Sequence, residues 1–288
     1  MSKVWLVTGS ARGLGRHIVE TALEAGERVL ATARDPQRLD DLVARYGDRV
    51  KTAALDVTDP AAARAAVQTA VDAFGRIDVL VNNAGFGHIS PFEQSPEDDF
   101  RAQIDTNFYG VVNVTRAVLP VMRAQKSGHI LHVSSVGGRI GNPGLAAYQS
   151  AKWAVGGFTE VLRQELAPIG IHMTALEPGG MATDWGTEAG SQIPPLLPEY
   201  EPSIGALLQL FAEHIGKERS DPARVAQVVL QLTRHDAPPA HLLLGSDALQ
   251  FSNAADAARA AEGEHWRDVT LSTDFGSVVD TGAAMPRD

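Results

Sequence analysis

Short apolar runs with strand character alternate with stretches of helical periodicity from the start of the chain. The first run, Lys3 to Thr8, leads into a glycine, and apolar residues then recur at helical spacing from Leu14 to Leu23. Six further strand-like runs follow, separated by helix-like segments: Val29–Ala33, Val50–Leu55, Val79–Val81, His129–Val133, Ile171–Leu176 and His241–Leu244. Alternating strands and helices form a parallel sheet covered on both faces. Right-handed crossovers then predict an α/β fold with a doubly wound, seven-stranded Rossmann-type sheet.

We expect one such domain to account for residues 1–288, because no internal repeat or low-complexity linker divides the chain. Residues 184–218 form an apolar insert between the sixth and seventh strands. Ligands bind at the carboxyl edge of such a sheet, so the insert is predicted to be a substrate lid rather than a plain surface loop. Residues 246–288 are predicted to form a helical extension that packs on the domain or contacts another subunit.

The composition excludes several classes of function. A net charge of −10 argues against binding to nucleic acid or to an anionic membrane. The absence of cysteine excludes disulfides, thiolate metal sites and cysteine nucleophiles. The first strand leaves no room for a signal peptide, and no apolar run approaches membrane-spanning length. We therefore expect a cytoplasmic protein with no metal site.

A glycine-rich loop joins the first strand to the first helix, with the sequence Thr8-Gly9-Ser10-Ala11-Arg12-Gly13-Leu14-Gly15. Gly9 permits a tight turn, Gly13 lets the backbone approach a pyrophosphate, and Gly15 allows close helix packing. The helix N-terminus offers amide donors and partial positive charge to the anion. This position favours a dinucleotide-binding loop over a structural turn. Its predicted cofactor contacts are Gly9, Ser10, Arg12, Gly13, Leu14 and Gly15.

The end of the second strand indicates which dinucleotide binds. A free ribose 2′-hydroxyl is usually met there by a carboxylate, which Ala33 cannot supply. Arg34 and Arg12 can instead pair with a 2′-phosphate, the alternative being that both are merely solvated. Asp35 can neutralise Arg34 or reach the ribose itself. NADP(H) is therefore expected rather than NAD(H).

Other strand ends carry further candidate contacts. Asp56 can accept a hydrogen bond from an adenine amino group or cap the helix that begins near Pro60. The small residues of Asn82-Asn83-Ala84-Gly85 suit close passage beside a flat cofactor, although a plain turn has the same composition. Thr183 can bind a nicotinamide carboxamide or cap the next helix. The contacts predicted at these ends are Asp56, Val57, Asn83, Ala84, Gly85, Pro178, Gly179 and Thr183.

Tyr148 and Lys152 are the candidate reactive pair. They lie four residues apart on a predicted helix and therefore share one face. At ~4 Å and an effective dielectric of ~20, the lysine charge would favour the phenolate by up to about 4 kcal/mol. That energy would lower the pKa of the phenol by roughly 3. A phenol tuned in this way can donate or accept a proton near neutral pH.

Two further polar residues complete the candidate site. Ser135 closes the fifth strand and can hydrogen-bond a substrate carbonyl. Asn107 lies in an apolar helical stretch, where a buried amide needs partners. It either satisfies a helix kink or holds a water against the lysine. His88 is a weaker candidate for a substrate contact; it is expected to be structural, and no ligand cluster surrounds it.

Together these motifs resemble those of the short-chain dehydrogenase/reductase family over roughly residues 3–250. The resemblance implies a nicotinamide cofactor and a catalytic tetrad. In that tetrad Tyr148 donates or accepts the proton and Ser135 orients the substrate oxygen. Lys152 binds the ribose and lowers the tyrosine pKa, while Asn107 anchors a proton-relay water. The second strand, the insert and the ending Leu244-Gly245-Ser246-Asp247 look most like the branch of 17β-hydroxysteroid- and retinol-dehydrogenase-like proteins, and Arg12 and Arg34 match NADP-preferring members.

The leading hypothesis is an NADPH-dependent oxidoreductase that transfers hydride between nicotinamide and a carbonyl or secondary alcohol. The apolar insert suggests a hydrophobic ketone or aldehyde, and a homodimer or homotetramer is expected. A non-catalytic NADP(H)-sensing or scaffold protein is the alternative, although a sensor does not need a poised phenol. A nucleotide-sugar epimerase is disfavoured because three residues separate Gly9 from Gly13 and no large C-terminal substrate domain follows.

Overall fold

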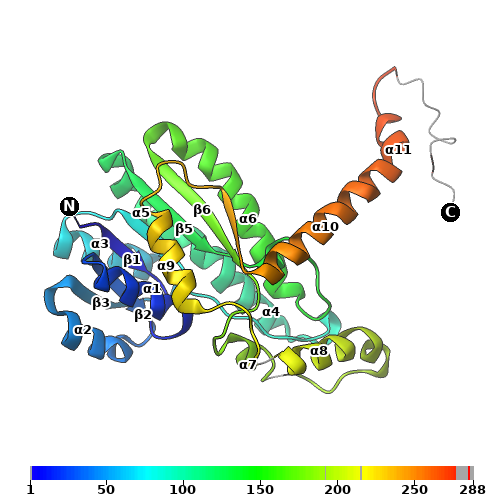
Figure 1. Ribbon diagram of the computed structural model, residues 1–288, viewed down its shortest axis with the longest axis horizontal. Coiled ribbons are helices and arrows are strands. Elements are labelled where there is room, and N and C mark those ends of the chain that lie inside the picture. The colour runs from blue at the N-terminus through cyan, green and yellow to red at the C-terminus, as the bar shows by residue number, and fades with distance from the viewer. Residues whose placement is uncertain (1, 192, 215, 277–284, 286–288) are drawn as a thin grey trace.

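A seven-stranded parallel sheet forms the centre of the molecule (Figure 1). The computed structural model describes residues 2–191, 193–214, 216–276 and 285. The strands run in the order β3-β2-β1-β4-β5-β6-β7, with every neighbouring pair parallel. Their bounds are β1 Val4–Val7, β2 Arg28–Ala33, β3 Val50–Ala54, β4 Val79–Asn82, β5 Gly128–Val133, β6 Ile171–Pro178 and β7 His241–Leu244. The predicted doubly wound sheet is therefore confirmed.

Helices cover both faces of this sheet. Successive side chains of each strand point to opposite faces, so both faces carry apolar side chains that need cover. The helices are α1 Gly13–Glu24, α2 Asp40–Tyr46, α3 Pro60–Phe74, α4 Glu97–Ile104, α5 Gly110–Gln125, α6 Ala146–Leu166, α7 Trp185–Ala189, α8 Ala206–His214, α9 Pro222–Leu232, α10 Ser246–His265 and α11 Arg267–Leu271. Trp5 and Val7 of β1 belong to the core under α1, α2 and α9, whereas Leu6 belongs to the core under α3 and α5.

The long helical stretch predicted before the fifth strand contains a widened turn. A π-helical turn, Asp105–Tyr109, joins α4 directly to α5. Single π-helical turns inside α-helices change the direction of the side chains they contain and are frequent at functional sites. Here the turn contains Asn107, which is fully buried.

The C-terminal part of the chain leaves the body of the molecule. Figure 1 shows α10 projecting away from the sheet, with α11 at its far end. Only Ala248 and Ser252 of α10 are buried. Residues 277–284 and 286–288 of the predicted extension lie outside the described residues. Within the described part of the chain, no helix combines the length and apolar character needed to cross a membrane.

Candidate active site

The glycine-rich loop has the conformation that its glycines permit. Gly9 and Gly13 have φ values of +67° and +55°, in the left-handed region that favours glycine. A Cβ atom on Gly15 would lie 2.4 Å from the carbonyl oxygen of Gly9, so the start of α1 approaches the loop too closely for any side chain. A Cβ on Gly13 would meet nothing nearer than Thr183, at 3.9 Å. The backbone at Gly13 and the N-terminus of α1 can therefore receive an anion.

Asn83 and Thr8 hold this loop in place. The Asn83 amide nitrogen Nδ2 donates to the carbonyl oxygens of Thr8 and Gly9, at 3.0 and 3.1 Å. The Thr8 hydroxyl accepts from the backbone N–H groups of Asn83 and Ala84, at 2.9 and 3.0 Å. The Asn83 side chain thus braces the loop, and Ala84 and exposed Gly85 form the edge beside it. Sequence reasoning named Asn83 but missed this bracing role and the contribution of Thr8.

Three of the predicted contacts point inward. The Ser10 hydroxyl is buried and donates to the Val7 carbonyl oxygen at 2.9 Å. The Leu14 side chain packs in the core beneath α1, and the buried Val57 side chain lies against Gly110. These residues can offer only backbone groups to a ligand.

Two arginines lie at the far end of the loop in different settings. Arg34 is exposed at the end of β2, whereas the Arg12 guanidinium is paired with the Glu188 carboxylate of α7. The Asp35 carboxylate accepts from the Gln37 backbone N–H at 3.1 Å, and among the described residues it forms no ion pair with Arg34. Arg34 therefore remains available to a phosphate group.

Asp56 forms a local turn rather than a helix cap. Its Oδ1 accepts from the backbone and the hydroxyl of Thr58, at 2.9 and 2.8 Å. These hydrogen bonds, together with the charge of Arg34, hold the pKa of Asp56 below its usual value. The alternative prediction, in which Asp56 caps the next helix, is wrong, because Asp59 caps α3 through the Ala61 N–H at 2.7 Å.

Tyr148 and Ser135 meet at the carboxyl edge of the sheet. Tyr148 lies in the first turn of α6 with 9% of its surface exposed. Ser135 follows β5, accepts from the Gly137 N–H at 3.0 Å and forms a hydrogen bond with the Tyr148 phenol. Burial raises the pKa of Tyr148 to about 12, and the hydrogen bond with Ser135 offsets only part of this effect.

Lys152 lies one turn further along α6. Its ammonium is 5.5 Å from the centre of the Tyr148 ring and donates to the Val133 carbonyl oxygen at 2.8 Å. Burial lowers the pKa of Lys152 to about 8. The expected fall in the tyrosine pKa is therefore wrong for this structure. Burial of the phenol dominates its pKa, and helical spacing alone could not indicate that burial.

Asn107 faces the lysine across a small space. Its Nδ2 donates to the carbonyl oxygens of Phe86 and Gln103, at 2.7 and 2.8 Å. Its buried Oδ1 has no hydrogen-bond partner among the described residues. A Cβ on Gly85 would lie 2.5 Å from this Oδ1 and 3.6 Å from Lys152 Nζ, so both polar atoms border the same space. An unsatisfied buried carbonyl oxygen that faces an ammonium suits a bridging water.

The segment after β6 lies across the glycine-rich loop. Pro178 ends β6, and the Gly179 N–H donates to the Leu244 carbonyl oxygen at 3.0 Å. Thr183 lies over Gly13, and its hydroxyl makes two long contacts of 3.5 Å: it donates to the Met181 carbonyl oxygen and accepts from the Trp185 N–H. Thr183 is thus placed to face a ligand in the loop, whereas the N-cap residue of α7 is Asp184.

His88 and Glu177 have structural partners. His88 Nδ1 lies 2.6 Å from an Asp99 carboxylate oxygen, and its backbone N–H donates to Gln103. Glu177 is buried and accepts from Arg139 and His241, each at 2.6 Å. None of these hydrogen bonds involves Tyr148. Within the described ranges, no group of three His, Asp or Glu side chains is arranged to hold a metal ion.

An apolar cluster from the insert covers Tyr148. The Trp185 indole packs on the Tyr148 ring, with centroids 4.9 Å apart and planes inclined by 47°. The rest of this cluster comes from the insert and the facing loops: Ile89, Leu145, Ala189, Ile193, Leu196, Tyr200, Ile204, Leu208 and Phe211. The surroundings of the phenol are therefore hydrophobic.

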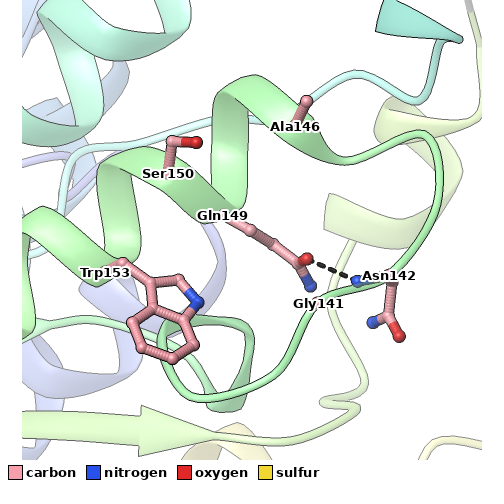
Figure 2. A pocket seen from close by; sticks show the side chains of 6 residues that line it. All are labelled: Gly141, Asn142, Ala146, Gln149, Ser150 and Trp153. Carbon is pink, nitrogen blue, oxygen red and sulfur yellow. Dashed lines mark hydrogen bonds between the residues drawn. The ribbon is translucent and has the colours of Figure 1, made fainter. Parts of the chain in front are cut away.

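Figure 2 shows a pocket beside the first turns of α6. Gly141, Asn142, Ala146, Gln149, Ser150 and Trp153 line it. The Gln149 carbonyl Oε1 accepts from the Asn142 N–H at 2.7 Å. Since Tyr148 and Lys152 do not line it, this pocket is separate from the candidate active site.

Comparison with known proteins identifies the family. The family profile described as short chain dehydrogenase matches residues 3–194. Oxidoreductase BOA17 of Botryotinia fuckeliana is 49% identical over 276 residues, which is 95% of this chain and 100% of that protein. A short-chain dehydrogenase structure from Streptomyces avermitilis is 37% identical, with a TM-score of 0.88 over 95% of this chain and 98% of that one.

Two further structures were solved with nicotinamide cofactors. A Burkholderia cenocepacia short chain dehydrogenase in complex with NADP is 26% identical, with a TM-score of 0.72 over 91% of this chain and 96% of that one. A Brucella melitensis 3-ketoacyl-(acyl-carrier-protein) reductase complexed with NADH is 27% identical, with a TM-score of 0.72 over 84% of this chain and 95% of that one. The chain described here is an oxidoreductase of the short-chain dehydrogenase family.

Proposed function

We propose that this enzyme is an NADPH-dependent reductase of hydrophobic ketones or aldehydes, with Tyr148 as the proton donor. The observation that carries this proposal is the buried Tyr148 phenol, which is hydrogen-bonded to Ser135 under an apolar lid. A phenol whose pKa is raised to about 12 is protonated at neutral pH. Reduction of a carbonyl needs this protonated form, whereas oxidation of an alcohol needs the phenolate.

A bound nicotinamide would supply the hydride that reaches the carbonyl carbon. Tyr148 gives its phenolic proton to the carbonyl oxygen as negative charge develops there, and Ser135 holds the same oxygen. With the hydride on carbon and the tyrosine proton on oxygen, the carbonyl becomes an alcohol. Lys152 Nζ and Asn107 Oδ1 border the space from which a water can return a proton to the site.

The loop fits a dinucleotide phosphate, and the two arginines favour NADP(H). Gly13 leaves its backbone open to a pyrophosphate, and Arg34 is exposed at the end of β2. A carboxylate at position 33 would favour NAD(H), but an alanine stands there. The similar Burkholderia structure contains NADP, in agreement with this preference, whereas the similar Brucella structure contains NADH. Comparing the Kd values of NADPH and NADH tests this preference.

The apolar insert supports a hydrophobic substrate of the kind handled by the 17β-hydroxysteroid- and retinol-dehydrogenase-like branch. Its partly buried side chains pack in the same apolar cluster as Tyr148. A panel of ketones and aldehydes of increasing apolar size tests this, with NADPH absorbance as the signal. Turnover should improve as the substrate buries more apolar surface. Tight NADPH binding without oxidation anywhere in the panel would favour a non-catalytic sensor instead.

The two reaction directions should respond differently to pH. Because the pKa of Tyr148 is about 12, the donor form prevails throughout pH 6–8 and the rate of reduction should be flat there. Below that pKa, the fraction of phenolate, which oxidation requires, rises about tenfold for each pH unit. The rate of oxidation should therefore increase up to at least pH 10. Initial rates for one ketone–alcohol pair at saturating cofactor provide the measurement. An oxidation rate that levels off below pH 8 would contradict the raised pKa.

We further propose that the chain forms a homodimer or homotetramer. The projecting α10 and α11 expose Leu249, Phe251, Trp266 and Leu271, and a helix that stands free of a core is marginal in water. Sedimentation equilibrium of the full chain should therefore give two or four times the 30.6 kDa mass of one chain. A monomer at micromolar concentration would contradict this.

A further inference from the structure

The short helix α7 touches both ends of the candidate site. Glu188 pairs with Arg12 at the glycine-rich loop, where its Oε2 accepts from Arg12 Nη2 at 2.5 Å. Trp185 packs on Tyr148 at the opposite end. The two residues are three apart on the same helical turn, so they face the same side of α7. One rigid turn therefore links the cofactor end of the site to the catalytic end.

The Trp185 contact covers one face of the Tyr148 ring. The Trp185 ring lies against Gly87 as well as Tyr148, since a Cβ on Gly87 would be 2.9 Å from Trp185 Cζ2. Tyr148 is consequently only 9% exposed. The opposite end of α7 is fixed by the buried Ala189, whose carbonyl oxygen accepts from the Ile89 N–H at 3.1 Å. The helix thus lies closed over the phenol.

The Arg12–Glu188 pair is open to competition. The two side chains are 47% and 45% exposed, so water and ions reach them. A carboxylate and a phosphate bind the same fork of guanidinium N–H groups, and one guanidinium face cannot serve both at once. A 2′-phosphate carries more negative charge than a carboxylate and would also be attracted by Arg34. NADH has a hydroxyl at that position and offers nothing to displace Glu188.

We propose that Glu188 is a specificity-determining residue that couples recognition of the cofactor to opening of the lid. Resting on the proposed NADP(H) function, this inference assigns the ribose 2′-phosphate as the group that takes Arg12 from Glu188. Loss of that ion pair removes one of the contacts that hold α7, and it shifts α7 toward a position in which Trp185 no longer covers Tyr148. NADPH would then both fill the loop and uncover the phenol for the carbonyl substrate, whereas NADH would leave α7 in place.

The variant Glu188→Gln tests this coupling because it removes the charge and keeps the side-chain size. An exposed ion pair of this kind contributes little, so the Kd of NADPH should fall by about two- to fivefold. The Kd of NADH should not change. Glu199→Gln, an exposed glutamate of the same insert, makes the same charge change away from Arg12 and should alter neither Kd. Isothermal titration of both cofactors with the three proteins gives these values.

A second readout follows the lid itself. Acrylamide quenching of Trp185, taken as the difference between the wild type and Trp185→Phe, should increase when NADPH binds but not when NADH binds. Without any cofactor, this quenching should be greater in Glu188→Gln than in the wild type. An unchanged NADPH affinity in Glu188→Gln, or equal gains for NADPH and NADH, would overturn the coupling alone. A wild type that binds neither cofactor would overturn the proposed function and the coupling together.

Discussion

Tyr148→Phe should lower kcat for carbonyl reduction by at least about 10²- to 10⁴-fold, the range that a positioned general acid contributes. The substitution removes one hydroxyl and keeps the ring that packs on Trp185. It leaves the glycine-rich loop untouched, so the Kd of NADPH should stay within about twofold of the wild type. Steady-state kinetics on the best carbonyl of the panel, with cofactor titration alongside, measure both quantities.

Tyr109→Phe is the matched control. This tyrosine lies in the π-helical turn beside Asn107 but is 52% exposed, so its hydroxyl has no role in the account. Its kcat should equal that of the wild type. Turnover in Tyr148→Phe that matches the control would remove the phenol from the mechanism, while loss of NADPH binding would reveal a structural role instead.

Lys152→Met should abolish most activity and yet stabilise the ligand-free fold. The lysine is 4% exposed, and burial lowers its pKa from 10.5 to about 8. Below pH 8 the folded chain must keep a charged ammonium out of water, which at 1.36 kcal/mol per pKa unit costs about 3 kcal/mol. Methionine avoids this cost but leaves the Val133 carbonyl oxygen unpaired, so a net gain of about 1–2 kcal/mol is expected at pH 7.

The pH dependence of the free energy of unfolding is an independent test of whether burial of Lys152 destabilises the fold. Between pH 8 and 10.5 the unfolded lysine still holds a proton that the folded one has released, so the wild type should gain stability as pH rises through this window. Lys152→Met should lack that gain, and denaturant unfolding at pH 7 and pH 10.5 measures it. Lys51→Met, at an exposed lysine, should behave like the wild type. A Lys152→Met protein less stable than the wild type at pH 7 would contradict a cost of burial.

Local pattern was sufficient to predict the sheet. Each strand run is bounded by turn residues and followed by a helix with one apolar face, so seven strands and their crossovers follow from periodicity. β2 begins one residue before the predicted Val29, and β6 continues two residues past Leu176 to Pro178. Strand ends depend on pairing with neighbours, which a single segment does not reveal.

The arrangement within the site was less predictable because it depends on contacts between distant segments. Helical spacing indicates that Tyr148 and Lys152 share a face, but burial, which for Tyr148 comes partly from the insert, decides the direction of both pKa changes. Glu188 carries no recognisable motif, and its contact joins residues 176 positions apart in the sequence. Asn83 was recognisable as a motif residue, yet only packing shows that it braces the loop of Gly9.

The most direct test follows the hydride from the cofactor into the product and asks whether Tyr148 is needed for the transfer. The enzyme is incubated with NADPH carrying deuterium on either face of nicotinamide C4 and with a hydrophobic ketone, and the alcohol is examined by mass spectrometry. One of the two labelled cofactors should deliver a single deuterium to the carbinol carbon, and Tyr148→Phe should form almost no labelled alcohol. Labelled alcohol formed equally well by Tyr148→Phe, or NADPH bound by the wild type without any labelled alcohol, would contradict the account.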